Sequence, residues 1–140
     1  NKSTMLEGGL RVPAMISWPG KLPEGEIRDQ AMTAMDWMPT LLELAGIEKP
    51  KVKFDGASLV TGLKDNSTPS HYEQIHWQWG NKWAVREGDF KLLGIGEKAL
   101  SLHRLTGDKP EQQDYLTEQS ELAGRLLKLH QDWHKEVTPK

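Results

Sequence analysis

The first half of the chain carries one clear helical pattern, between residues 36 and 45. Asp36 can cap its N-terminus, Pro39 falls in the first turn, where no N–H is needed, and Gly46 follows the last residue. Apolar side chains recur along one face at helical spacing: Met35, Met38, Leu42 and Ala45. We therefore predict a helix over residues 36–45.

The apolar run Ala14–Trp18 is typical of a short buried strand. A proline at its start suits strand entry, and the Pro-Gly pair that follows it ends the run. Residues 47–69 are mostly loop and contain several Lys, Gly and Pro, so they are the best candidate for a boundary between subdomains. We place the two parts at residues 1–68 and 69–140.

Alternating apolar and polar positions in the second half predict three or four antiparallel strands. One strand is expected within residues 71–79. Residues 82–86 and 90–94 flank Glu87-Gly88-Asp89, which is a hairpin signature. The alternation over residues 100–104 predicts one more strand.

An amphipathic helix is predicted over residues 120–135. Leucine and tryptophan form a stripe at helical spacing there: Leu122, Leu126, Leu129 and Trp133. Such a stripe covers one face of a sheet. The elements together predict an α+β fold, in which a small antiparallel sheet of three to four strands packs with a C-terminal helix.

Charge and composition argue against two classes of partner. Lys and Arg (18) nearly balance Asp and Glu (20), and the net charge of −2 gives no electrostatic basis for binding nucleic acid or an anionic membrane. No apolar run approaches the ~20 residues that span a bilayer. Cysteine is absent, which excludes thiolate chemistry from this segment. Since the first residue is Asn, we expect the true start, with any targeting signal, to be missing.

The opening residues are the first candidate for chemistry. Lys2, Ser3 and Thr4 precede a Gly8-Gly9 turn signal. An ammonium and two hydroxyls can donate hydrogen bonds to an oxyanion. Because such clusters are common on surface loops, the local chemistry alone favours a solvated loop.

The second candidate is the aromatic stretch that begins at His76. Trp77, Gln78 and Trp79 follow it, and aromatic rings beside amide and imidazole groups suit a sugar, whose apolar face stacks while its hydroxyls form hydrogen bonds. Alternating tryptophans equally suit a core between sheet and helix. We interpret Trp83 as core and keep His76, Trp77, Gln78 and Trp79 as candidate substrate contacts.

His130 and His134 are spaced like a zinc-binding pair on the last helix. No third ligand is evident, and no Glu follows His130. We therefore interpret both as solvated histidines near a helix C-terminus.

Six stretches, in one order along almost the whole chain, resemble segments of the sulfatase family. The string up to Pro13 looks like the family's Gly-Lys-x-Thr-x-x-Glu-Gly-Gly-x-Arg-Val-Pro segment, with Asn1 where the family usually has Gly. The family's Trp-Pro-Gly-Lys strand end is similar to residues 18–21, its Asp-x-x-Pro-Thr-Leu helix to residues 36–46, and its Asp-Gly-x-Ser-Leu loop to residues 55–59. Its C-terminal hairpin is similar to residues 84–92, and its Leu-Tyr-Asp-Leu-x-x-Asp turn is similar to residues 102–108.

The resemblance implies the end of an alkaline-phosphatase-like α/β domain, followed by a small α+β subdomain. It also implies hydrolysis of sulfate esters by a formylglycine, with calcium held by Asp and Asn or Gln side chains. Neither the nucleophile motif nor a calcium ligand set is evident in the chain. Lys2 alone matches a family active-site residue, a lysine that contacts a sulfate oxygen. Glu7, Gly8, Gly9 and Arg11 match positions that we interpret as scaffold.

From this resemblance we expect a sulfated small molecule or carbohydrate as substrate, and the missing N-terminal part of the same protein as partner. Apolar surface would then be exposed where that part is absent, and the chain alone would be inactive. A periplasmic or secreted location is a family expectation. Two alternatives stay open: a phosphodiesterase or phosphonate hydrolase of the same superfamily, and a non-catalytic binding module.

Overall fold

The structure is a computed structural model that describes residues 4–138. These residues form two compact units, which we describe separately. The sheet unit joins the N-terminal residues up to Pro13 with the chain from Glu73 onward, and the second unit is Ala14–Tyr72. The predicted division between residues 68 and 69 concerns the domains of an intact protein and stays a prediction.

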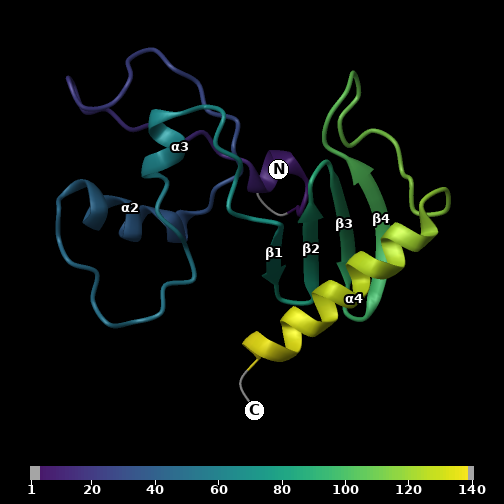
Figure 1. Cartoon of the computed structure of the whole chain (residues 1–140). Helices are drawn as coiled ribbons and strands as arrows, with labels where there is room; N and C mark the ends of the chain where they lie inside the picture. The colour runs from purple at the N-terminus through teal and green to yellow at the C-terminus, as the bar shows by residue number, and fades with distance from the viewer. Residues whose placement is uncertain (1–3, 139–140) are drawn as a thin grey trace. The chain divides into compact units, whose positions relative to one another are not determined.

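A four-stranded antiparallel sheet forms the centre of the sheet unit (Figure 1). Its strands follow one another in sequence order: β1 Gln74–Trp79, β2 Lys82–Glu87, β3 Phe90–Ile95 and β4 Lys98–Arg104. Two-residue turns join them, and each turn begins with a glycine at positive φ: Gly80 at 58°, Gly88 at 53° and Gly96 at 52°. Such turns match the twist of the flanking strands. The predicted antiparallel sheet, including its hairpin, is confirmed.

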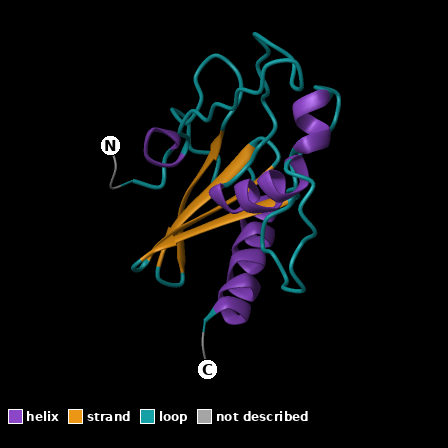
Figure 2. Ribbon diagram, turned by 90° about the vertical axis from the view of Figure 1, so that its left-hand side faces the viewer, coloured by secondary structure: helices purple, strands orange, loops and turns teal. Residues whose placement is uncertain are grey.

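Helix α4, Ser120–Val137, lies across one face of this sheet (Figure 2). Its apolar stripe and the strands enclose a common core: Trp83, Val85, Leu92, Leu102, Ala123 and Leu126. Leu122 and Leu129 pack against it, so the predicted helix and its stripe are confirmed. Among the residues that the structure describes, no helix is both long and apolar enough to cross a membrane.

Trp83 is the largest side chain of this core, and its position depends on Gly94. A Cβ on Gly94 would come within 2.0 Å of the Trp83 ring. Glycine therefore leaves the space in which the ring lies across β3. The indole N–H then donates a hydrogen bond to the Gly96 carbonyl at 2.7 Å. With 2% exposure, Trp83 is a core residue as predicted.

The N-terminal segment binds the sheet on the face opposite α4. Its helix α1, Glu7–Leu10, is a single helical turn at the predicted Gly-Gly turn, and Met5 before it is buried. The Glu7 carboxylate contacts Lys91 of β3. Since side chains alternate along a strand and Leu92 faces α4, Lys91 points away from α4.

The second unit contains three short helical segments and, among its described residues, no strand. The 3-10 turn η1, Ala34–Asp36, leads directly into α2, Trp37–Leu44, and α3 is Val60–Lys64. The helix predicted over residues 36–45 is thus confirmed within one residue at each end. Gly46, with a φ of 66°, ends it through a Schellman arrangement, in which the Ile47 N–H donates to the Leu42 carbonyl at 2.9 Å.

The prediction that Asp36 caps α2 is wrong. Its side chain makes no capping bond to that helix. Thr33 caps η1 instead, and the Asp36 carboxylate accepts the Thr33 N–H at 2.7 Å. The extra turn moves the helical start upstream, so Asp36 occupies the third position of a capping box.

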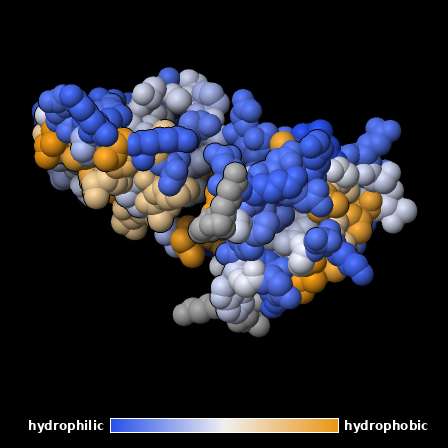
Figure 3. Space-filling model, turned by 90° about the horizontal axis from the view of Figure 1, so that it is seen from below, coloured by the Kyte–Doolittle hydropathy of each residue, from blue (hydrophilic) through white to orange (hydrophobic). Residues whose placement is uncertain are grey.

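The prediction of a buried strand at Ala14–Trp18 is also wrong. The segment has no regular structure, and Met15 is 93% exposed. A buried strand needs a neighbouring strand for its N–H and C=O groups, and none of the described residues of this unit supplies one. Apolar side chains gather on the surface of the second unit (Figure 3). They include Met35 and Met38, which the sequence analysis placed on the apolar face of the helix.

Candidate functional site

The candidate sulfate contact Lys2 lies outside the described residues, but the segment that follows it is bound to the sheet. Lys91 Nζ lies 2.7 Å from Glu7 Oε1 and 2.6 Å from Glu111 Oε1. The Glu7 backbone N–H also donates to Glu111 Oε2 at 2.8 Å. Glu7 therefore anchors the segment, as a scaffold residue would. The Arg11 side chain is exposed.

Strand β1 separates the four candidate substrate contacts onto two faces of the sheet. His76 and Gln78 each lie opposite a β2 residue of the core beneath α4. Directly opposed residues share a face, and neighbours along a strand do not. His76 and Gln78 therefore point toward α4, whereas Trp77 and Trp79 share the opposite face. The structure brings the two tryptophans together and separates them from the other two candidates.

His76 belongs to the packing between β1 and α4. Its ring stacks on Trp133, with ring centroids 4.9 Å apart and an interplanar angle of 6°. Burial lowers the pKa of His76, which keeps the imidazole neutral near pH 7. A neutral, stacked ring offers no positive charge to a sulfate, so His76 is the weakest of the four candidates.

Trp77, Trp79 and Lys82 form what we call the aromatic edge, on the sheet face away from α4. Trp79 is 60% exposed and Trp77 is half-buried. Lys82 is the cross-strand partner of Trp79, and its Nζ lies 5.6 Å from the Trp79 ring centroid. This is a cation–π distance. Aromatic faces beside a positive charge can bind a sugar ring and an anionic substituent on it.

The prediction that His130 is solvated is wrong. It is 4% exposed, and its ring stacks on Trp83 with centroids 4.2 Å apart. Burial, followed by the nearby His76 and His134, lowers the pKa of His130 to about 4. His130 follows Leu126 by four residues and so extends the apolar stripe, which is a signal present in the sequence. His134 is exposed, as predicted.

Asp36 has a role that the sequence analysis did not identify. Its buried carboxylate accepts hydrogen bonds from the Ala57 N–H at 3.0 Å and the Tyr72 hydroxyl at 2.8 Å. His71 Nε2 lies 3.1 Å from the same carboxylate. Burial raises the pKa of Tyr72 to about 12, so the phenol remains a hydrogen-bond donor. The contacts join residues far apart in sequence, which no local pattern predicts.

Two of the stretches that resemble the sulfatase family therefore bind one another. Besides the contact from Asp36 to Ala57, the Thr40 hydroxyl accepts the Leu59 N–H at 2.9 Å. A Cβ on Gly56 would lie 2.4 Å from the Met35 backbone, so glycine is required for this close approach. The helix and the loop that carry the resemblance form a structural contact.

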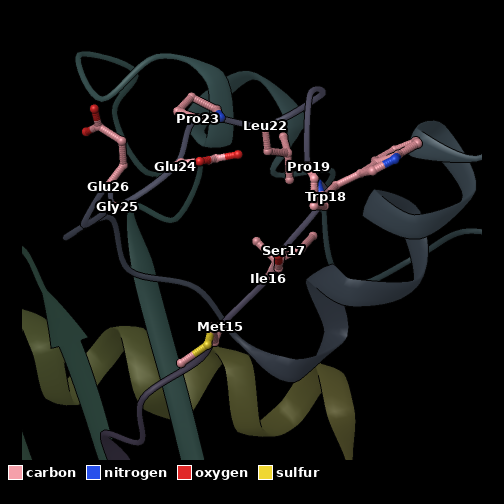
Figure 4. Close-up of a pocket in the computed structure, with 10 residues that line it drawn as sticks. All are labelled: Met15, Ile16, Ser17, Trp18, Pro19, Leu22, Pro23, Glu24, Gly25 and Glu26. Carbon is pink, nitrogen blue, oxygen red and sulfur yellow. The ribbon is translucent and has the colours of Figure 1, made fainter.

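A pocket of about 340 Å³ in the second unit has the wrong charge for a sulfate (Figure 4). Glu24 and Glu26 lie in its wall, and none of the described residues that line it is basic. Arg28, outside the lining, pairs with Glu26 at 3.0 Å. The wall is otherwise formed by Met15, Ile16, Ser17, Trp18, Pro19, Leu22, Pro23 and Gly25. We do not place an anionic substrate here.

The described part of the chain offers no metal centre. Within residues 4–138, no group of three or more His, Cys, Asp or Glu side chains is arranged to hold a metal ion. The calcium that the resemblance implies stays an expectation for the intact protein. His130 and His134 also belong to no such group among the described residues.

Comparison with known proteins finds similarity to sulfatases. A family profile described as "N-sulphoglucosamine sulphohydrolase, C-terminal" matches residues 1–131. An uncharacterized sulfatase of Schizosaccharomyces pombe, PB10D8.02c, is 28% identical over 140 aligned residues, which cover 91% of this chain and 25% of that protein. The N-acetylgalactosamine-6-sulfatase of Sus scrofa is 32% identical over 121 residues, covering 73% and 23%. The chain spans about a quarter of the length of these relatives.

Solved structures share the fold. The crystal structure of Ps i-CgsB in complex with k-i-k-neocarrahexaose matches 83% of this chain and 27% of its own, with a TM-score of 0.67 and 21% identity. The structure of BT4656 in complex with its substrate D-glucosamine-2-N,6-O-disulfate matches 71% and 23%, with a TM-score of 0.55 and 21% identity. At this level of identity the likeness shows the fold alone.

Proposed function

Because this chain belongs to the sulfatase family, as its C-terminal region, we propose that the intact protein hydrolyses sulfate esters on a carbohydrate. The family match over residues 1–131 carries this proposal. The name of the Sus scrofa relative and the bound disulfate of BT4656 both refer to amino sugars that carry sulfate, which supports a carbohydrate substrate. A chain of about a quarter of the relatives' length would supply one part of the active site.

Lys2 is the residue that we propose to act in the reaction. By resemblance it contacts a sulfate oxygen, and its charge would offset the negative charge that develops on the leaving oxygen or the sulfate. The formylglycine nucleophile and the calcium would come from the remainder of the intact protein. The sequence contains no cysteine, and the described residues hold no metal-binding group.

The aromatic edge is the part of the chain that we propose to bind the sugar. Trp79 exposes most of its surface, and the Lys82 ammonium lies beside its ring. An apolar sugar face would stack on the tryptophan, while the ammonium attracts a sulfate group. Trp83 has no such role because it is buried in the core.

The proposed reaction is tested with the intact protein and with the 140-residue chain. Both are given an aryl sulfate and sulfated mono- and disaccharides, and released sulfate is measured. We expect turnover from the intact protein and none from the chain alone. Lys2→Ala should lower kcat by about 100-fold or more, whereas the exposed Lys128→Ala control should not change it.

Three outcomes would contradict the proposal. Turnover by the chain alone would show that it holds its own nucleophile. A near-normal rate for Lys2→Ala would reject the sulfate contact. Hydrolysis of a phosphodiester or phosphonate in preference to every sulfate ester would favour the alternative activity of the superfamily.

The sugar-binding part of the proposal has its own test. Trp79→Ala should raise KM about tenfold for a sulfated disaccharide, because a stacking contact contributes on the order of 1 kcal/mol. KM for a small aryl sulfate should stay unchanged. Trp18→Ala, which removes an exposed tryptophan of the second unit, is the matched control. An equal rise in KM for both substrates would exclude a specific sugar contact.

A further inference from the structure

Three charged side chains from distant parts of the chain meet in a closed ring on the sheet face opposite α4. Lys91 comes from β3, Glu7 from α1, and Glu111 from the loop after β4. The Lys91 ammonium contacts both carboxylates, and Glu111 also accepts the Glu7 N–H. Each member of this ring therefore contacts the other two. We call Glu7, Lys91 and Glu111 the ion ring.

The ion ring is buried to an unusual degree for charged groups. The Lys91 side chain is fully buried, and those of Glu7 and Glu111 are 21% and 13% exposed. Removing charges from water is costly, and an apolar replacement of similar volume is often at least as stable. Stability alone therefore gives weak grounds for three charges here. The ring supplies two hydrogen bonds, from Lys91 to Glu7 and from the Glu7 N–H to Glu111, and these fix where one segment lies on another.

Glu111 itself is held in a conformation that a non-glycine residue adopts rarely. Its φ is 59°, and its backbone N–H donates to the Arg104 carbonyl at the end of β4 at 2.9 Å. Such strain persists where the surrounding contacts determine the backbone. The conformation directs one carboxylate oxygen to Lys91 and the other to the Glu7 N–H. Glu111 thus holds both the side-chain partner and the backbone of Glu7.

We propose that Lys91 and Glu111 are positioning residues: they fix the segment Met5–Leu10, which follows the proposed sulfate contact Lys2 in the sequence. This inference rests on the proposed function. Lys2 precedes Glu7 by five residues, and Met5 between them is buried. The ring therefore fixes a segment that begins three residues after Lys2 in the sequence. A displacement of about 1 Å at a reacting group can lower the rate about 100-fold.

The first experiment needs no activity. Amide hydrogen exchange is measured on the 140-residue chain and on Glu7→Gln, which removes one charge but leaves the pair between Lys91 and Glu111. Exchange over residues 5–10 should rise about tenfold or more, while amides of β2 and β3 keep their protection. Asp132→Asn is the matched control, because Asp132 forms exposed pairs with Lys128 and Lys135. Unchanged exchange over residues 5–10 both in Glu7→Gln and in Lys91→Met/Glu111→Gln would overturn the positioning role.

The second experiment links the ring to Lys2 in the intact protein. Glu7→Gln should lower kcat about tenfold with little change in KM, but in a Lys2→Ala background it should lower kcat less than about twofold, because it acts through the lysine. Equal losses in both backgrounds would overturn the link to Lys2. The double variant Lys91→Met/Glu111→Gln, which removes the ring from the sheet side, should show the same dependence on Lys2. An intact protein with no sulfatase activity would overturn the proposed function, while the exchange experiment would still decide whether the ring fixes the segment.

Discussion

The sheet unit buries a core of large apolar side chains, whereas the second unit fully buries few of its own. In the sheet unit, strands and helix enclose one core around Trp83 and Leu126. In the second unit the buried hydrophobic residues are Leu22 and Val60, and eight large ones are exposed. Asp36 and Thr40 there bind loop residues through buried polar contacts. The sheet unit thus contains an apolar core, whereas buried hydrogen bonds join the helix and the loop of the second unit.

The exposed apolar face of α2 indicates what the second unit requires. Met38 and Leu41 are 58% and 53% exposed, although they lie on a well-formed helix. Soluble proteins rarely expose large contiguous apolar patches. We propose that the remainder of the intact protein covers this face. The difference between the units then reflects what each one contacts in the intact protein.

The largest expected effect comes from a buried leucine of α4. Leu126→Ala in α4 should lower the free energy of unfolding of the sheet unit by about 2–5 kcal/mol, because the side chain is fully buried and leaves a cavity. Leu41→Ala in α2 is the matched control and should change stability by less than about 0.5 kcal/mol. Hydrogen exchange measures the two units separately.

Either variant could contradict this comparison of the two units. A large loss from Leu41→Ala would show that the second unit has an apolar core involving α2. A small loss from Leu126→Ala would show that α4 is not essential to the core of the sheet unit.

A smaller effect is expected from pH in the same core. The pKa of His130 is lowered to about 4, from an ordinary value of 6.5. The unfolded chain therefore binds a proton at higher pH than the folded one, so stability is full above about pH 6.5 and falls as pH drops toward 4. The loss is on the order of 2–3 kcal/mol by pH 4. His76, whose pKa burial also lowers, adds a loss of the same sign.

The control for this prediction is His130→Phe, which keeps an aromatic ring against Trp83 but cannot be protonated. Urea unfolding between pH 7 and pH 4, followed by tryptophan fluorescence, should show a shallower decline for the variant. Equal declines for the two proteins would mean that His130 is protonated in the folded state without cost.

Structural elements whose signals lie in neighbouring residues of the sequence were predicted well. The alternation and the Gly-containing turn around Gly88 predicted the hairpin, and the leucine stripe predicted α4 and its buried face. These signals are local, because period and turn chemistry are set within a few residues. The burial of His130 could also have been predicted from the sequence, since His130 continues the same stripe.

Elements and contacts that depend on residues distant in sequence were not predicted well. Ala14–Trp18 is apolar, but whether such a run becomes a strand depends on a neighbour that the second unit does not supply among its described residues. The contacts of Asp36 to Ala57 and Tyr72 and of Lys91 to Glu7 join residues between 21 and 84 positions apart. No spacing rule predicts such pairs. For the candidate site, the sequence suggested the tryptophans, but only the strand register separated them from His76.

The smallest expected effect tests the hydrogen bonds of Asp36 in the second unit. Asp36→Asn should destabilise this unit by about 1–2 kcal/mol, because the amide group replaces one carboxylate oxygen and cannot accept hydrogen bonds at that position. The carboxylate now accepts the N–H groups of Thr33 and Ala57 and the Tyr72 hydroxyl. Exposed Asp29→Asn is the matched control. Hydrogen exchange should become faster over η1, α2 and residues 55–59, while the sheet amides keep their protection. If Asp36→Asn leaves those rates unchanged, the polar network does not stabilise the second unit, and the contrast with the sheet unit fails.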